Sequence, residues 1–113
     1  YIVSYKIVDG SGKGFVLAYK VIVIDNIAPI LQINDKIQKL TPIEFDIFNL
    51  LFQNHGNMVS AQRLLKEVWG YEPDDSVETI RVHIRHLRSK IDKISGDKKY
   101  IETIYGGGYK LNI

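Results

Sequence analysis

Residues 77–91, with the sequence VETIRVHIRHLRSKI, constrain the fold more than any other stretch of this chain. Their apolar members recur at alternating spacings of three and four, which is the periodicity of one face of an α-helix. These members are Val77, Ile80, Ile84, Leu87 and Ile91. At about 100° per residue, the opposite face carries Glu78, Arg81, Val82, Arg85, His86 and Ser89. We expect a helix over residues 76–94 that packs with its apolar face and presents cations on the other.

A β-hairpin is expected directly after this helix, at residues 99–113. Two alternating apolar runs, YIETIY and YKLNI, flank Gly106, Gly107 and Gly108. A period of two is typical of strands, and consecutive glycines supply the positive φ that a tight turn needs. A basic helix followed by a C-terminal hairpin indicates a DNA-binding winged helix.

Two further helices are predicted in the middle of the chain, so that residues 41–94 form a three-helix core. Thr41 is expected as an N-cap, with Pro42 at the first helical position and Glu44 completing a capping box. Gly56 is a stop signal for this helix, and Ser60 is the expected N-cap of the second. In the second helix, we expect the inward-pointing residues to be Leu64, Leu65, Val68 and Trp69.

The N-terminal part, residues 1–40, predicts a small antiparallel sheet of four strands. Residues 2–8 and 15–24 are rich in Val, Ile and Tyr, and the sequence DGSGKG separates them as a turn would. Two short strands follow, at 30–33 and 37–40, with a turn at Asn34 and Asp35. The expected fold class is therefore α+β, in a single domain covering residues 1–113.

Composition is ordinary for a soluble globular protein, with 45% hydrophobic and 25% charged residues. The charge is unevenly distributed, because residues 81–110 carry eight Lys or Arg against three acids, while the remainder carries seven against ten. No run reaches the roughly 18 apolar residues of a membrane span, so we expect a cytoplasmic protein without membrane contact. The chain begins at Tyr1 rather than Met, and we expect it to be part of a larger protein.

Four motifs in a fixed order resemble those of a known family. LTPIEF, VWG, VHIRHLRSKI and IETIYGGGYKL are similar to the C-terminal effector domains of OmpR/PhoB-type response regulators, which are transcription factors of bacterial two-component systems. The resemblance runs from about Val21 to the end. It implies a four-stranded sheet, three helices and a wing, with the third helix in the major groove and the wing at the neighbouring minor groove. It also implies a homodimer on tandem half-sites and an upstream phosphorylatable receiver domain, which we expect to lie outside residues 1–113.

The chemistry of the helix suggests roles for its outward residues. Arg85, near the middle of the outward face, is the expected bidentate contact to guanine, and Val82 is suited to pack on a thymine methyl group. The flanking residues are expected mainly at phosphates: Thr79, Arg81, His83, His86, Arg88 and Ser89.

Two positions depart from the commoner family pattern. His86 stands where many relatives have a second arginine, and Tyr105 stands where many wings carry one. A tyrosine brings no charge into a narrow, electronegative minor groove. We therefore expect Lys99 or Lys110 to contact the DNA backbone, and the sequence leaves open whether Tyr105 reads the minor groove.

The acidic segment GYEPDD, at residues 70–75, corresponds in the family to the loop that approaches RNA polymerase. Its candidate contact residues are Tyr71, Glu72, Asp74 and Asp75. A solvated turn rich in acids would look the same, so both interpretations stay open.

Other classes of function fit the sequence poorly. DGSGKG lacks the serine or threonine of a phosphate loop and opens no helix. His83 and His86 are spaced to share a metal, but their neighbours are arginines, which repel cations. No catalytic arrangement of side chains is apparent, so we expect no enzyme, cofactor or metal. The remaining alternative is a winged helix used mainly for protein interaction or dimerisation.

Overall fold

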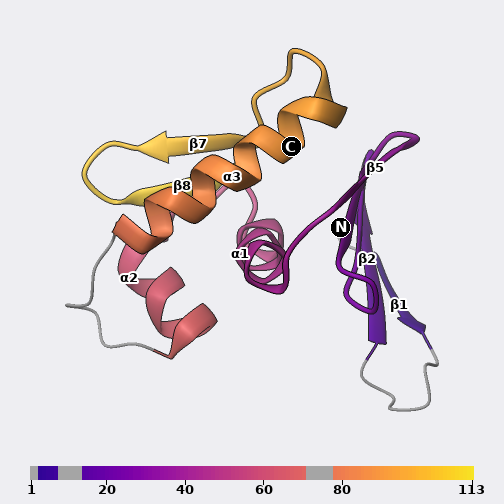
Figure 1. Ribbon diagram of the computed structural model, residues 1–113, viewed down its shortest axis with the longest axis horizontal. Coiled ribbons are helices and arrows are strands. Elements are labelled where there is room, and N and C mark those ends of the chain that lie inside the picture. The colour runs from indigo at the N-terminus through magenta and orange to yellow at the C-terminus, as the bar shows by residue number, and fades with distance from the viewer. Residues whose placement is uncertain (1–2, 8–13, 71–77) are drawn as a thin grey trace.

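The computed structural model describes residues 3–7, 14–70 and 78–113, with side chains from residue 14 onward. Along the chain the elements are β1 (Val3–Ile7), β2 (Gly14–Tyr19), β3 (Ile22–Asp25), β4 (Ile30–Ile33), β5 (Lys36–Lys39), α1 (Pro42–Gln53), β6 (Val59–Ser60), α2 (Ala61–Leu64), the π-helical turn η1 (Leu65–Trp69), α3 (Glu78–Ser95), β7 (Ile101–Ile104) and β8 (Gly108–Leu111). Figure 1 shows α1 between the N-terminal sheet on the right and α2, β7 and β8 on the left, with α3 crossing above α1. Among the described helices, none has both the length and the apolar character needed to cross a membrane.

The N-terminal sheet is antiparallel, and its strands follow one another in chain order from β1 to β5. The expected α+β class is thereby confirmed, and the turn at Asn34 is where the sequence predicts it. Residues 15–24, expected as one strand, are two strands, so this sheet has five strands among the described residues. They join at a two-residue turn between the paired Tyr19 and Ile22, where Lys20 takes a φ of 53°. Two-residue hairpin turns of this kind need positive φ, which is uncommon for residues such as lysine. The sequence therefore did not predict a turn at Lys20.

The start of α1 is fixed by the predicted capping box. The Thr41 amide donates to Glu44 Oε1 at 2.9 Å, and the Glu44 amide donates to Thr41 Oγ1 at 3.2 Å, with Pro42 opening the helix. The helix ends at Gln53, and Gly56 follows with a φ of 82° while donating its amide to the Leu111 carbonyl. This hydrogen bond connects the end of α1 to the C-terminal hairpin.

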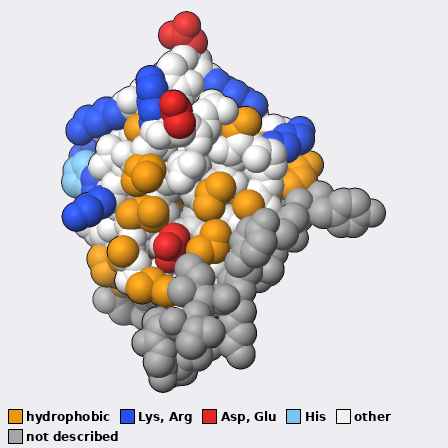
Figure 2. All heavy atoms as spheres, turned by 90° about the vertical axis from the view of Figure 1, so that its right-hand side faces the viewer, with side chains coloured by type: hydrophobic (Ala, Val, Ile, Leu, Met, Phe, Trp, Pro, Cys, Tyr) orange, Lys and Arg blue, Asp and Glu red, His pale blue; other side chains and the backbone are white. Residues whose placement is uncertain are grey.

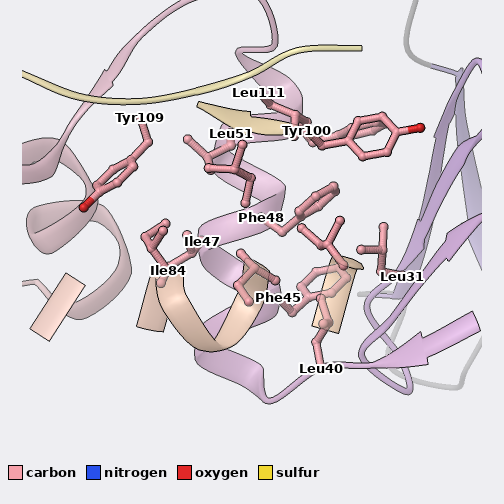
Figure 3. Packing of buried hydrophobic residues seen from close by; sticks show 14 of the residues in the cluster. Leu31, Leu40, Phe45, Ile47, Phe48, Leu51, Ile84, Tyr100, Tyr109 and Leu111 are labelled. Carbon is pink, nitrogen blue, oxygen red and sulfur yellow. The ribbon is translucent and has the colours of Figure 1, made fainter. Parts of the chain in front are cut away.

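The hydrophobic core surrounds α1. In Figure 3, Phe45 and Phe48 point toward Leu31 of the N-terminal sheet, whereas Ile47 points toward Ile84 of α3 on the other side. Phe48, Ile47 and Leu31 are completely buried, and burial of such a side chain stabilises a fold by about 1.5 to 3 kcal/mol. The helix thus connects the sheet to α3 through one continuous apolar cluster.

The second predicted helix begins as expected, because Ser60 Oγ accepts a hydrogen bond from the Arg63 amide. It continues as η1, which Gly70 ends with a φ of 75°. Leu64 and Leu65 are completely buried. Val68 and Trp69 also pack against the core but remain half-buried.

Candidate nucleic-acid interface

The two faces of α3 differ as the sequence predicts. Its apolar stripe is buried, with exposed fractions of at most 8%, and consists of Ile80, Ile84, Leu87, Ile91 and Ile94. On the opposite side the structure exposes Arg81, Val82, Arg85, His86 and Ser89, which we call the open face of α3. Val82 is 37% exposed although it is apolar. The open face therefore presents the exposed side chains of Arg81 and Arg85, together with the exposed apolar side chain of Val82, to solvent.

One flank of the open face connects to the C-terminal hairpin through Arg88. Its Nη2 donates to the Ile101 carbonyl at 3.1 Å and to Thr103 Oγ1 at 2.6 Å. The guanidinium also lies 5.8 Å from the centre of the Tyr109 ring. The sequence predicts a phosphate contact for Arg88, but the structure turns this side chain toward strands β7 and β8.

The other flank connects to the helical body of the domain. His83 Nδ1 lies 2.8 Å from the Thr79 carbonyl oxygen, and its ring meets the edge of Trp69 at 5.3 Å between centres. Both His83 and Thr79 are half-buried. These two predicted phosphate contacts therefore sit beside the open face rather than on it.

Further along the same flank, Lys90 pairs with the buried Glu44 of α1. The distance from Lys90 Nζ to Glu44 Oε1 is 2.5 Å, and the Glu44 side chain is only 4% exposed. Burial alone raises the pKa of Glu44, but hydrogen bonds from Lys90 and the Thr41 amide outweigh it and hold this pKa below its ordinary value. One carboxylate thus closes the N-terminal cap of α1 and fixes α3 against it.

The wing, which we define as β7, the turn after it and β8, stands beside the start of α3. Strand β8 pairs with β7 on one side and with β6 on the other. A Cβ on Gly108 would lie 2.1 Å from the Val59 carbonyl oxygen, so this position requires glycine. At the tip, Tyr105 is fully exposed.

A groove of about 340 Å³ lies between the wing, the start of α2 and the start of α3. It is lined by Ala61, Gln62, Arg81, Thr103, Ile104, Gly106, Gly107, Gly108 and Tyr109. Arg81 Nη1 lies 2.7 Å from Glu78 Oε1, and both side chains are about two-thirds exposed. Gln62 and Thr103 were not among the residues expected at a binding site. The sequence could have indicated Gln62 by its position in the first turn of α2, directly after the Ser60 cap. It could have indicated Thr103 as a polar residue on strand β7.

The remaining predicted lysines have acidic neighbours. Lys99 Nζ lies 3.5 Å from Asp92, and Lys110 Nζ lies 3.6 Å from Glu102. A hydrogen bond from Asn112, followed by the charge of Lys110, lowers the pKa of Glu102. Lys99 is 76% exposed and Lys110 is 30% exposed, so Lys99 is the more accessible of the two cations.

The outer side of the N-terminal sheet has a different character. Figure 2 shows the molecule from this side, with hydrophobic side chains across the centre and Lys and Arg side chains along the upper and left margins. The candidate contact residues Tyr71, Glu72, Asp74 and Asp75 of the acidic loop lie outside the described residues. Within the described part, the open face of α3 and the wing are the strongest candidates for an interface with DNA.

Comparisons with known proteins agree with this geometry. The family described as "Transcriptional regulatory protein, C terminal" matches residues 35–111. The DNA-binding dual master transcriptional regulator RpaA of Synechocystis sp. is 53% identical over 75 residues, which cover 66% of this chain and 31% of RpaA. Regulatory protein VanR of Enterococcus faecium is 48% identical over 80 residues, which cover 70% of this chain and 35% of VanR. The chain thus spans about a third of the length of these curated relatives.

Solved structures show the same fold. The DNA-binding domain of CpxR from E. coli matches with a TM-score of 0.73 and 27% identity, covering 86% of this chain and 95% of that one. The family match, the capped α1, the amphipathic α3 and the wing all lead to one assignment. The chain belongs to the family of C-terminal domains of transcriptional regulatory proteins, and it has the winged-helix fold of OmpR/PhoB-type effector domains.

Proposed function

We propose that this domain binds double-stranded DNA sequence-specifically and thereby controls transcription. The main support for this proposal is the open face of α3, where Arg81 and Arg85 are exposed while the apolar stripe is buried. The major groove of B-DNA is about 12 Å wide and admits an α-helix. RpaA is a DNA-binding regulator and the matched CpxR structure is a DNA-binding domain, which supports the same role for this chain.

Within this proposal the residues of the open face have distinct roles. Arg85 contacts a guanine through two hydrogen bonds, and Val82 packs against a thymine methyl group. Arg81, His86 and Ser89 contact phosphates, which fix the register of the helix without reading sequence. Across the groove, Gln62 offers an amide donor to the DNA backbone between the helix and the wing.

Lys99 contributes at the DNA backbone, and Lys110 does so less because it is more buried and paired. Tyr105, at the exposed tip, adds contact area at the minor groove without adding charge. His83, Thr79 and Arg88 support the interface from its flanks.

The larger setting is also part of the proposal. The domain acts in the cytoplasm as the effector part of a two-component response regulator, whose receiver domain precedes it and is phosphorylated. Two copies occupy tandem half-sites about one helical turn apart, and the acidic loop contacts RNA polymerase. Membership of this family supports the larger setting proposed here.

Two measurements test the proposal. In a titration with mixed-sequence duplex DNA, the logarithm of the binding constant should fall linearly with the logarithm of salt concentration, with a slope of about −0.9 for each phosphate contact. A domain used only for protein interaction or dimerisation would give no salt-dependent binding to duplex DNA. That result would contradict the proposal.

The second measurement tests whether Arg85 recognises a base of the DNA site. Selection from randomised duplexes should show that Arg85→Ala weakens binding to the preferred site by about 1 to 3 kcal/mol and relaxes the preference at one base pair. Lys99→Ala is the matched control, because it removes one exposed cation and should weaken binding about equally on all sequences. An unchanged base preference in Arg85→Ala would contradict the role given to Arg85.

A further inference from the structure

Arg88 differs from the two arginines of the open face in where its side chain goes. Arg81 and Arg85 are exposed, whereas Arg88 is half-buried on the flank of α3 that faces the wing. Its Nη2 donates to two acceptors of β7, the Ile101 carbonyl and Thr103 Oγ1. The guanidinium also lies near the Tyr109 ring of β8. One side chain therefore connects α3 to both strands of the wing.

All three of these partners are neutral. Arginine remains charged in proteins, and hydrogen bonds from a charged donor are shorter and stronger than neutral ones. These contacts therefore hold the guanidinium in one place. A side chain held by three groups of its own domain is poorly placed to turn toward a phosphate.

On its β8 side the wing is hydrogen-bonded to the body of the domain, because the Gly56 amide donates to the Leu111 carbonyl and the Ala61 amide donates to the Gly107 carbonyl. Strand β8 pairs with β6 at only two positions, Val59 with Tyr109 and Ser60 with Gly108. Strand β7 is at the edge of its sheet and pairs with β8. The groove lies between the wing, the start of α2 and Arg81 of the open face. The hydrogen bonds of Arg88 join the edge strand β7 to α3 and so contribute to the distance between helix and wing.

We propose that Arg88 is a positioning residue that sets the distance between the wing and the open face of α3, so that both engage one duplex together. This inference rests on the proposed function, because it assigns to Arg88 a part in the same DNA interface. It replaces the phosphate contact that the sequence predicts for this residue.

The matched pair Arg88→Gln and Arg85→Gln tests the inference, because both remove one guanidinium from the same helix three residues apart. On the site selected by the wild-type domain, hydroxyl-radical footprinting should show that Arg88→Gln loses protection under the wing and keeps protection under α3. The affinity should fall roughly tenfold, the size expected for losing a hydrogen bond to a charged group. Arg85→Gln should show the opposite pattern, with altered base preference and an intact footprint under the wing.

A double-mutant cycle separates positioning from a second phosphate contact. Thr103→Val removes one acceptor of Arg88 without changing charge. If the two side chains act as a pair, Thr103→Val should weaken binding by about threefold in the wild-type background and have little further effect in Arg88→Gln. Additive losses, or a wing footprint that survives Arg88→Gln, would overturn the inference.

A third measurement needs no DNA. The chain contains no cysteine, so spin labels can be introduced at the exposed positions Ser89 and Tyr105. The distance distribution between α3 and the wing tip should be narrow in the labelled domain and broader after Arg88→Gln. An unchanged distribution would overturn the inference. If the wild-type domain protects no duplex, the proposed function fails, and this measurement still decides whether Arg88 holds the wing.

Discussion

The pair between Glu44 and Lys90 leads to a quantitative prediction for Glu44→Gln. Glutamine keeps a side-chain oxygen for the Thr41 amide, so the variant removes mainly the charge that Lys90 contacts at 2.5 Å. A hydrogen bond to a charged group contributes about 1.5 to 3 kcal/mol. The Lys90 side chain is 27% exposed and can recover part of this through water. We therefore expect a loss of about 1 to 2 kcal/mol in the free energy of unfolding near pH 7.

This loss should depend on pH in a definite direction. The pKa of Glu44 is lower in the folded domain than its ordinary value of 4.5. A carboxylate with a depressed pKa contributes stability above its unfolded pKa, and that contribution is lost as the pH falls through the folded pKa. The stability difference between wild type and Glu44→Gln should therefore be fully present at neutral pH and shrink below about pH 4.5.

Urea unfolding followed by circular dichroism, at a series of pH values, measures both quantities. Glu67→Gln is the matched control, because Glu67 also contacts a cation, Arg63, but both of these side chains are 45% exposed. Such a surface pair contributes about 0 to 1 kcal/mol. If Glu44→Gln cost no more than Glu67→Gln, or if its cost did not change with pH, the reasoning about this buried pair would be refuted.

Three further changes have defined outcomes. Gly108→Ala places a Cβ 2.1 Å from the Val59 carbonyl oxygen, so β8 should separate from β6 and the backbone amides of the wing should exchange hydrogen faster. Gly106→Ala is the milder comparison, because its Cβ would meet no atom within 4 Å. Ile84→Ala empties part of the completely packed interface beneath α3 and should lower the free energy of unfolding by about 2 to 5 kcal/mol in urea titration; a loss below 1 kcal/mol would mean that this site is loosely packed. Tyr105→Arg adds a cation at the fully exposed wing tip and should steepen the salt dependence of DNA binding by about 0.9, whereas an unchanged slope would mean that the tip does not approach DNA.

Local signals in the sequence were sufficient for much of the fold. The capping box of Thr41 and Glu44 depends only on residues three apart, and the structure forms it as predicted. The apolar stripe of α3 is a property of helix periodicity, and its members Ile80, Ile84, Leu87 and Ile91 are buried. Such features need no knowledge of distant contacts.

Features that depend on distant contacts were missed. The turn at Lys20 lies between segments rich in Val, Ile and Tyr and contains no Gly, Pro, Asn or Asp to mark it in the sequence. In the sequence Arg88 looks like the other arginines of α3, yet its acceptors on β7 are 13 and 15 residues away. His83 likewise packs against Trp69, which lies outside α3, so the periodicity of α3 does not reveal this contact. The open face could be predicted from the sequence, whereas the division between contacting and supporting residues required coordinates.

The proposed function places DNA against the open face of α3. NMR spectra of the isotope-labelled domain, recorded while the selected duplex is added, test it most directly. We expect the largest shift changes at the Val82 methyl groups, the Arg85 side chain and the wing tip at Tyr105. Changes confined to the outer face of the N-terminal sheet, with Val82 and Arg85 unaffected, would contradict it.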